Sequence, residues 1–187
     1  MKALKNHANR AAATPLLADD VLEFHAGRLM LLLATCGGGA GAVNGLTKMA
    51  KLDFFVRYPY FFEAVRRGAD QPTADRALAV EAAMTRHHYG PWDRRYYHVL
   101  AFLEARRLIT VKKSGKSFRI ALTKTGKAVA KRLASSSAFS GLRVQMQRVA
   151  ESLGDKTGNQ LKTLIYATFS EEVGRRPLGH VIEVRHP

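Results

Sequence analysis

The chain has 187 residues, of which 47% are hydrophobic, and a formal net charge of +15. The apolar content is high enough for a packed core and excludes a disordered chain. The single cysteine, Cys36, excludes an internal disulfide framework and fits a reducing compartment. The N-terminus lacks the apolar run of a signal peptide, and the most apolar stretch, Leu29 to Ala34, is too short to cross a bilayer. We therefore expect a cytoplasmic protein that has no membrane partner and is attracted to polyanions.

The first half of the chain is predicted to be helical. Residues 1–18 are basic and Ala-rich without periodicity, which predicts a loose leader. Apolar residues then recur at helical spacing from Val21 until three glycines begin at Gly37, and a Gly-rich loop runs on to Gly45. Further helical segments are expected over 46–57, from Pro59 to Gly68, and over 72–86.

The segment after Gly90 changes period from 3.6 to 2. A helix is expected over 94–107, with Asp93 as its N-cap and an apolar stripe. Residues 108–113 and 117–122 alternate like strands around a tight turn at 114–116, and Thr123 caps a helix over 124–134. The apolar stripe of the helix over 94–107 consists of Tyr96, Val99, Leu100 and Leu103. The order helix, hairpin, helix is typical of a winged helix.

The predicted fold is therefore mainly α with a small β-hairpin (α+β): a winged helix-turn-helix with extra N- and C-terminal helices. The expected units are the leader 1–18, a winged-helix domain with an N-terminal helical extension at 19–134, and a C-terminal helical pair and tail at 135–187. The pair follows a serine linker and covers about 141–153 and 159–169. The tail is expected to be irregular, with a terminal strand at 181–184.

Positive charge is concentrated in the winged segment. Residues 91–135 hold 12 lysines and arginines against two acidic residues, which is two thirds of the excess charge. We expect this cluster to contact DNA, in preference to its being only a solvated basic face. Whether Arg94 and Arg95 read guanine edges or are simply solvated is open at this point. The predicted DNA-binding residues are Arg94, Arg95, Lys112, Lys113, Lys116, Arg119, Lys124 and Lys127.

Catalytic and metal motifs fail on inspection. The Gly-rich stretch CGGGAGAVNGLTK lacks the spacing of a phosphate-binding loop. His87, His88 and His98 lack the partners of a tetrahedral metal site, and Cys36 has no helper base in the sequence. We expect no enzyme, no catalytic residue, no metal and no cofactor. Trp92 and Tyr96 are expected in the core, and the role of Tyr97 is open.

The phrase LEARRLITV…FRIALTKTGKAV resembles the recognition helix, wing and following helix of MarR-like regulators. The matching parts are Leu103-Glu104, Leu108-Ile109 and the Leu-Thr-x-x-Gly run from Leu122 to Gly126. This resemblance is specific for fold more than for function. It implies one possible function, a DNA-binding transcriptional regulator that acts as a homodimer.

Three longer phrases together resemble the middle component of ABC three-component systems, the Lamassu-type bacterial defence operons. They are GLTKMAKLDFFVRYPYFFEAV, RHHYGPWDRRYYHVLAFLEARRLITV and LKTLIYATF. The resemblance implies a non-enzymatic accessory subunit in antiphage or anti-plasmid defence. Its implied partners are an SMC-like ATPase with a coiled coil and a separate effector subunit, often a nuclease, besides DNA.

Overall fold

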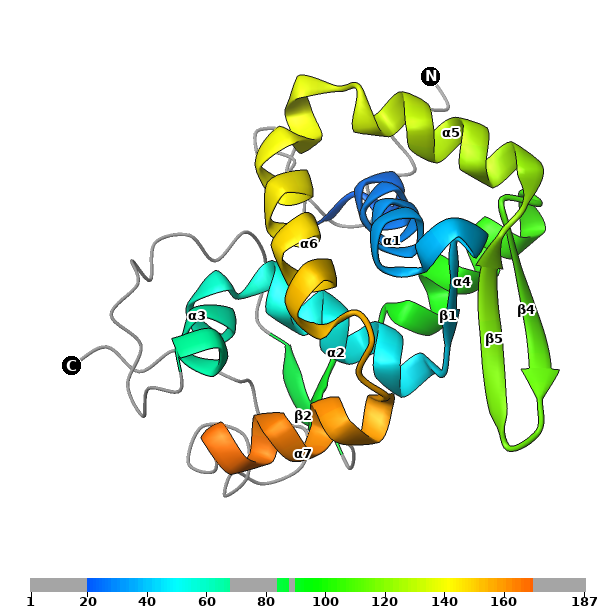
Figure 1. Cartoon of the computed structure of the whole chain (residues 1–187). Helices are drawn as coiled ribbons and strands as arrows, with labels where there is room; N and C mark the ends of the chain where they lie inside the picture. The colour runs from blue at the N-terminus through cyan, green and yellow to red at the C-terminus, as the bar shows by residue number, and fades with distance from the viewer. Residues whose placement is uncertain (1–19, 68–83, 88–89, 170–187) are drawn as a thin grey trace, which may run out of the picture.

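The computed structural model describes residues 20–67, 84–87 and 90–169. Within them the expected mainly helical fold with a small antiparallel sheet is confirmed (Figure 1). In chain order the elements are α1 (Leu22–Cys36), the 3-10 turn η3 (Gly38–Ala40), β1 (Ala42–Asn44), α2 (Leu46–Arg57), α3 (Pro59–Arg67), β2 (Thr85–His87), β3 (Gly90–Trp92), α4 (Tyr96–Ala105), β4 (Ile109–Ser114), β5 (Ser117–Leu122), α5 (Lys124–Ala134), η5 (Ser137–Phe139), α6 (Ser140–Leu153) and α7 (Gly158–Thr168). The predicted leader, residues 72–83 of the predicted 72–86 helix and the tail lie outside these residues.

Helix α1 forms the centre of the molecule. It is surrounded by α2, α4, α5 and α6, with the sheet at one end (Figure 1). Its residues from His25 to Leu33 are all buried, as expected for a helix that is apolar around most of its circumference. The helix ends at Gly37, where the glycine run begins, as predicted. α6 packs on α1 and α2, and α7 packs on α2, so the C-terminal pair shares this core.

The sheet has the strand order β1-β5-β4, and the β4–β5 hairpin, called the hairpin below, projects beyond the helices (Figure 1). Residues 109–114 and 117–122 pair as antiparallel strands, close to the predicted bounds. Strand β1 was predicted as loop. It has only three residues, which is too few to show an alternating pattern in the sequence. It forms a strand because Val43 pairs with Ile120, which is far away along the chain. The hairpin is thereby anchored to the helical body.

The Leu-Thr-x-x-Gly run joins the hairpin to α5. The Thr123 hydroxyl accepts a hydrogen bond from Gly126 N (2.9 Å), which confirms the predicted cap, and donates to Arg107 O (2.8 Å). A Cβ added at Gly126 would lie 1.9 Å from Leu108 O, so only glycine permits this approach. The motif therefore fixes the angle between α5 and the hairpin.

Two predicted boundaries before α4 are wrong. Residues 85–87 do not end a helix; they form β2, which pairs with β3. Asp93 is not the N-cap, because α4 begins at Tyr96 after a turn at Arg94 and Arg95. Asp93 is 7% exposed and its carboxylate binds two arginines. Asp93 Oδ1 also accepts a hydrogen bond from Arg95 N (2.9 Å), so the carboxylate caps the turn that precedes α4 and pairs with the arginines at the same time.

Candidate nucleic-acid interface

One face of the hairpin carries a pair of like charges. The register places Lys112 on β4 directly opposite Arg119 on β5, and both side chains are exposed. Directly opposed like charges destabilise an antiparallel pair. Arg119 Nη1 donates to Asn44 Oδ1 (3.3 Å), a neutral acceptor on β1. This face therefore keeps two neighbouring positive charges that no described carboxylate neutralises.

The opposite face and the tip of the hairpin extend the positive surface. Lys113 pairs with Phe118, on the face that continues inward to the buried Ile120. Lys116 follows Gly115 in the two-residue turn, where Gly115 has φ +60°. All of these side chains except Ile120 are exposed. The four predicted hairpin cations thus surround the projecting end of the sheet.

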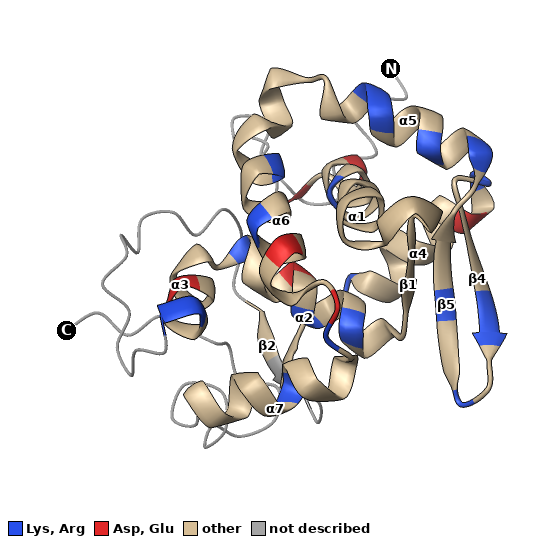
Figure 2. Ribbon diagram, in the orientation of Figure 1, with Lys and Arg blue, Asp and Glu red and all other residues tan. Residues whose placement is uncertain are grey.

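Helix α5 continues the positive surface away from the hairpin. Figure 2 shows lysines and arginines on both strands of the hairpin and along α5. Lys124 and Lys127, both predicted, are exposed in its first turn. The exposed Lys131 and Arg132 in its last turn extend the surface and were not predicted. Basic residues in a last helical turn also suit the helix dipole, so these two have a structural reason as well.

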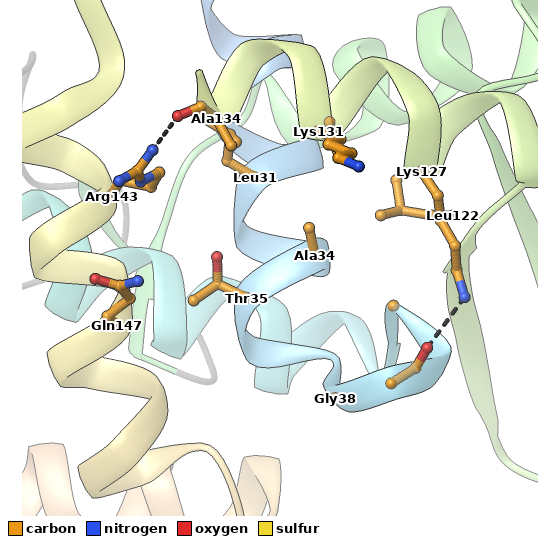
Figure 3. Close-up of a pocket in the computed structure, with 13 residues that line it drawn as sticks. Leu31, Ala34, Thr35, Gly38, Leu122, Lys127, Lys131, Ala134, Arg143 and Gln147 are labelled. Carbon is orange, nitrogen blue, oxygen red and sulfur yellow. Dashed lines mark hydrogen bonds between the residues drawn. The ribbon is translucent and has the colours of Figure 1, made fainter. Parts of the chain in front are cut away.

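A hollow of about 410 Å³ lies beside α5, between α1, η3 and α6 (Figure 3). Within the described part of the chain, three basic side chains and no carboxylate line it. Lys127 Nζ donates to Gly39 O (3.1 Å), and Arg143 Nη1 donates to Ala134 O. Figure 3 shows Thr35 of α1 and Gln147 of α6 among the side chains that line it. Lys127 is therefore partly engaged in holding α5 against the glycine turn.

The two predicted arginines before α4 have different environments. Arg94 is exposed. Arg95 donates to both carboxylate oxygens of Asp93 and contacts His25 Nε2 at 2.9 Å. Burial alone would raise the pKa of Asp93, but hydrogen bonds from Arg95 and the nearby charges of Arg57 and Arg95 hold it well below its usual range. Arg95 thus belongs to an internal ion-pair network, whereas Arg94 is open to solvent.

That network continues through the core and was not predicted. Asp93 Oδ2 also accepts from Arg57 Nη1 at 2.8 Å. His25 Nδ1 lies 3.1 Å from Arg28 Nη1, and Arg28 Nε lies 3.0 Å from Asp53 Oδ1. Tyr96, from α4, donates to Asp53 Oδ2 (2.7 Å). Polar groups of α1, α2 and the turn before α4 are thereby linked inside the protein. These buried charged residues therefore connect helices to one another and are not available to a partner.

Cys36 has the properties of a structural thiol. Its side chain is buried, and Sγ lies 3.9 Å from Met146 O. Burial raises the pKa of the thiol to about 12, with a lowering effect of Lys48 and a raising effect of Asp53. A protonated thiol is a poor nucleophile. Among the described residues, no group of three or more His, Cys, Asp or Glu side chains could hold a metal ion.

The described helices are all too short or too polar to span a bilayer. No protein-family model matches the chain, and no curated protein or solved structure matches it either. Its own fold and surface are therefore the observations that bear on function.

Proposed function

We propose that the chain is a non-enzymatic winged-helix protein that binds duplex DNA through the hairpin, Arg94 and α5. The element order α1, β1, α2, α4, β4, β5 supports a winged helix, with α3 and the β2–β3 pair inserted between α2 and α4. Strand β1 beside the hairpin completes a three-stranded sheet. In this arrangement α4 is the recognition helix and the hairpin is the wing.

The observation that carries the proposal is the unneutralised charge of the hairpin. Within the described residues, no carboxylate forms an ion pair with Lys112, Lys113 or Lys116. Of the two acidic residues in 91–135, Asp93 is buried in ion pairs, and Glu104 accepts a hydrogen bond from Val111 N (3.0 Å). A polyanion is the partner that turns this repulsion into attraction.

Phosphate contacts account for most of the proposed interface. Lysines on a projecting hairpin reach phosphates without reading sequence. Arg94 is the exposed arginine nearest the start of α4, so it is the candidate for a base edge. Arg95 is left out of the proposed interface because its guanidinium is already bound to Asp93.

Two double variants test the interface. Lys112→Gln/Lys116→Gln removes two hairpin charges, and Arg66→Gln/Arg67→Gln removes two exposed charges from α3, which lies away from the hairpin (Figure 1). We expect the hairpin variant to lower the salt slope of duplex binding by about 0.9 per lost phosphate contact. The measurement is fluorescence anisotropy with a 20-base-pair duplex at several salt concentrations. Equal weakening by both variants would overturn the interface.

The resemblance to the middle component of ABC three-component systems leads to a second part of the proposal, on assembly. The chain would act as the accessory subunit of an SMC-like ATPase and its effector in antiphage or anti-plasmid defence. Co-purification with an ATPase encoded beside its gene is the expected result. A symmetric homodimer with nanomolar affinity for a palindrome upstream of its own gene would instead favour the MarR-like regulator. Light scattering and footprinting separate the two.

A further inference from the structure

A groove of about 520 Å³ lies between the hairpin tip, the start of α2 and the start of α7. It brings together positive charge and aromatic rings. Of the residues that the structure describes, three lysines, three aromatic side chains and no carboxylate line it. The residues that matter are Lys48, Lys116, Lys162, Trp92, Tyr97 and Phe118.

Tyr97 is an exposed ring that packs against a buried one. It is 63% exposed, although Tyr96 beside it is fully buried. Its ring centroid lies 5.8 Å from that of Trp92, at an interplanar angle of 46°. Trp92 is itself buried and packs edge-on against Tyr96. The Tyr97 ring therefore has a buried aromatic neighbour, while much of its own surface stays open to solvent.

Phe118 is the second exposed ring. Along β5 it lies on the same face as Ile120 and Leu122, both buried, but it lies beyond the edge of the core and is 50% exposed. Its carbonyl accepts a hydrogen bond from Gly45 N (2.8 Å), which ties this part of β5 to the start of α2. Among the described residues, the large hydrophobic side chains that are exposed are Tyr97, Phe118 and Val144, and two of these line the groove.

The lysines give the groove a positively charged lining. Lys48 Nζ donates to Gly154 O (2.6 Å) at the end of α6, so its ammonium group is fixed near the groove. A Cβ at Gly158 would lie 2.9 Å from Lys48 N, so the start of α7 lies directly against the first turn of α2. Lys116, in the hairpin turn, approaches from the opposite side.

We propose that this groove binds unpaired nucleotides of single-stranded DNA, with bases stacked on Tyr97 and Phe118 and phosphates held by the lysines. Exposed aromatic rings beside lysines suit unpaired bases, since every base has a π-face. A duplex keeps its bases stacked internally and offers no free face to these rings. Among the described residues, the lining has lysines and no carboxylate, which fits a polyanionic strand better than a peptide. This inference rests on the proposed function and extends it from duplex to unpaired DNA.

The test compares the rings with matched controls on the full chain. Tyr97→Ala and Phe118→Ala remove one ring each, Tyr97→Phe keeps the ring, and Val144→Ala removes an exposed hydrophobic side chain outside the groove. With a labelled 15-nucleotide oligo-dT, we expect each ring loss to weaken binding about tenfold. Tyr97→Phe and Val144→Ala should stay within twofold of the parent, as should the duplex affinity of the Tyr97 and Val144 variants.

The only tryptophan of the chain, Trp92, gives an independent signal because it lines the groove. Oligo-dT should quench its emission, whereas the duplex should leave it nearly unchanged. Unchanged oligo-dT affinity in Tyr97→Ala/Phe118→Ala would overturn the groove while leaving duplex binding intact. If duplex binding does not depend on the hairpin lysines, while oligo-dT binding still depends on the two rings, the proposed function is overturned and the groove is not. Tighter binding of oligo-U than of oligo-dT would overturn the assignment to DNA.

Discussion

The interior and the hairpin of this protein use basic residues in opposite ways. In the interior, Arg28 and Arg57 are 1% exposed, and each lies against a carboxylate, Asp53 or Asp93. On the hairpin, Lys112 lies opposite another cation, Arg119, and is open to solvent. Interior charges are enclosed with opposite charges, whereas hairpin charges are exposed beside like ones.

This difference shows why net charge alone does not identify a binding surface. The interior arginines contribute to the +15, yet they cannot reach a partner. The interior also contains acids that would otherwise offset the surface, since Asp53 and Asp93 are both buried. The surface of the hairpin and α5 therefore has a larger excess of positive over negative charge than the composition of its segment indicates. Removing an interior ion pair and removing the repulsion on the hairpin should therefore change the unfolding free energy by different amounts and in opposite directions.

The largest effect is expected from Asp53→Asn. This change keeps the shape of the side chain and removes the carboxylate that lies 3.0 Å from Arg28 Nε. A buried arginine then loses its counter-charge, and removal of one partner from a buried pair costs about 3–5 kcal/mol of unfolding free energy. Urea denaturation measures the loss. Glu151→Gln, an exposed site on α6, is the control and should change stability by about 0.5 kcal/mol or less. Similar stability of both variants would contradict the importance of the interior pairing.

The next effect is a pH dependence from Lys51. This side chain is fully buried, and its Nζ donates to Pro91 O (2.8 Å). Burial, together with the charge of Lys162, lowers its pKa from 10.5 to about 7. Between these two values the unfolded chain binds more protons than the folded chain, so the contribution of Lys51 to stability rises with pH. The slope is at most about 1.4 kcal/mol per pH unit.

Lys51→Met isolates this contribution. The parent should gain stability relative to Lys51→Met as pH rises from about 7 to 10, and the difference should be constant below about pH 6. Denaturation curves of both proteins across this range are the measurement. If the two pH profiles run parallel throughout, Lys51 keeps its ordinary pKa in the folded protein.

Local sequence signals were sufficient to predict the hairpin and the helices beside it. Alternation, a glycine in the turn and a threonine cap act over a few residues, so the sequence predicted the bounds of β5 and α5 and, to within one residue, those of β4. Strand β1 and the β2–β3 pair could not. They are three residues long, and β1 depends on a partner some 75 residues away in the sequence.

The interior charges and the groove depended on contacts between distant segments. Arg28 lies within an apolar run of α1 and Asp53 before two phenylalanines of α2, and a charge inside such a run is a signal that could have indicated a buried pair. Arg95 could not be separated from Arg94 by sequence, because only the structure shows which one meets Asp93. The position of Tyr97 relative to Phe118 likewise depends on how α4 and the sheet pack.

The smallest effect on stability is expected from Lys112→Glu. This variant also distinguishes most clearly between the role of the hairpin charges and that of the interior charges. On the hairpin this change replaces a repulsive cross-strand pair by an attractive one with Arg119, which should add about 0.2–1 kcal/mol of unfolding free energy. The same change places a negative charge where a phosphate is proposed to lie, so duplex affinity should fall, most strongly at low salt. Lys112→Gln is the matched control and should lie between parent and glutamate in both measurements. A variant that loses stability and affinity together would mean that Lys112 supports the fold, as the interior charges do. Opposite signs would mean that the hairpin keeps an unfavourable charge pair for the sake of a polyanionic partner.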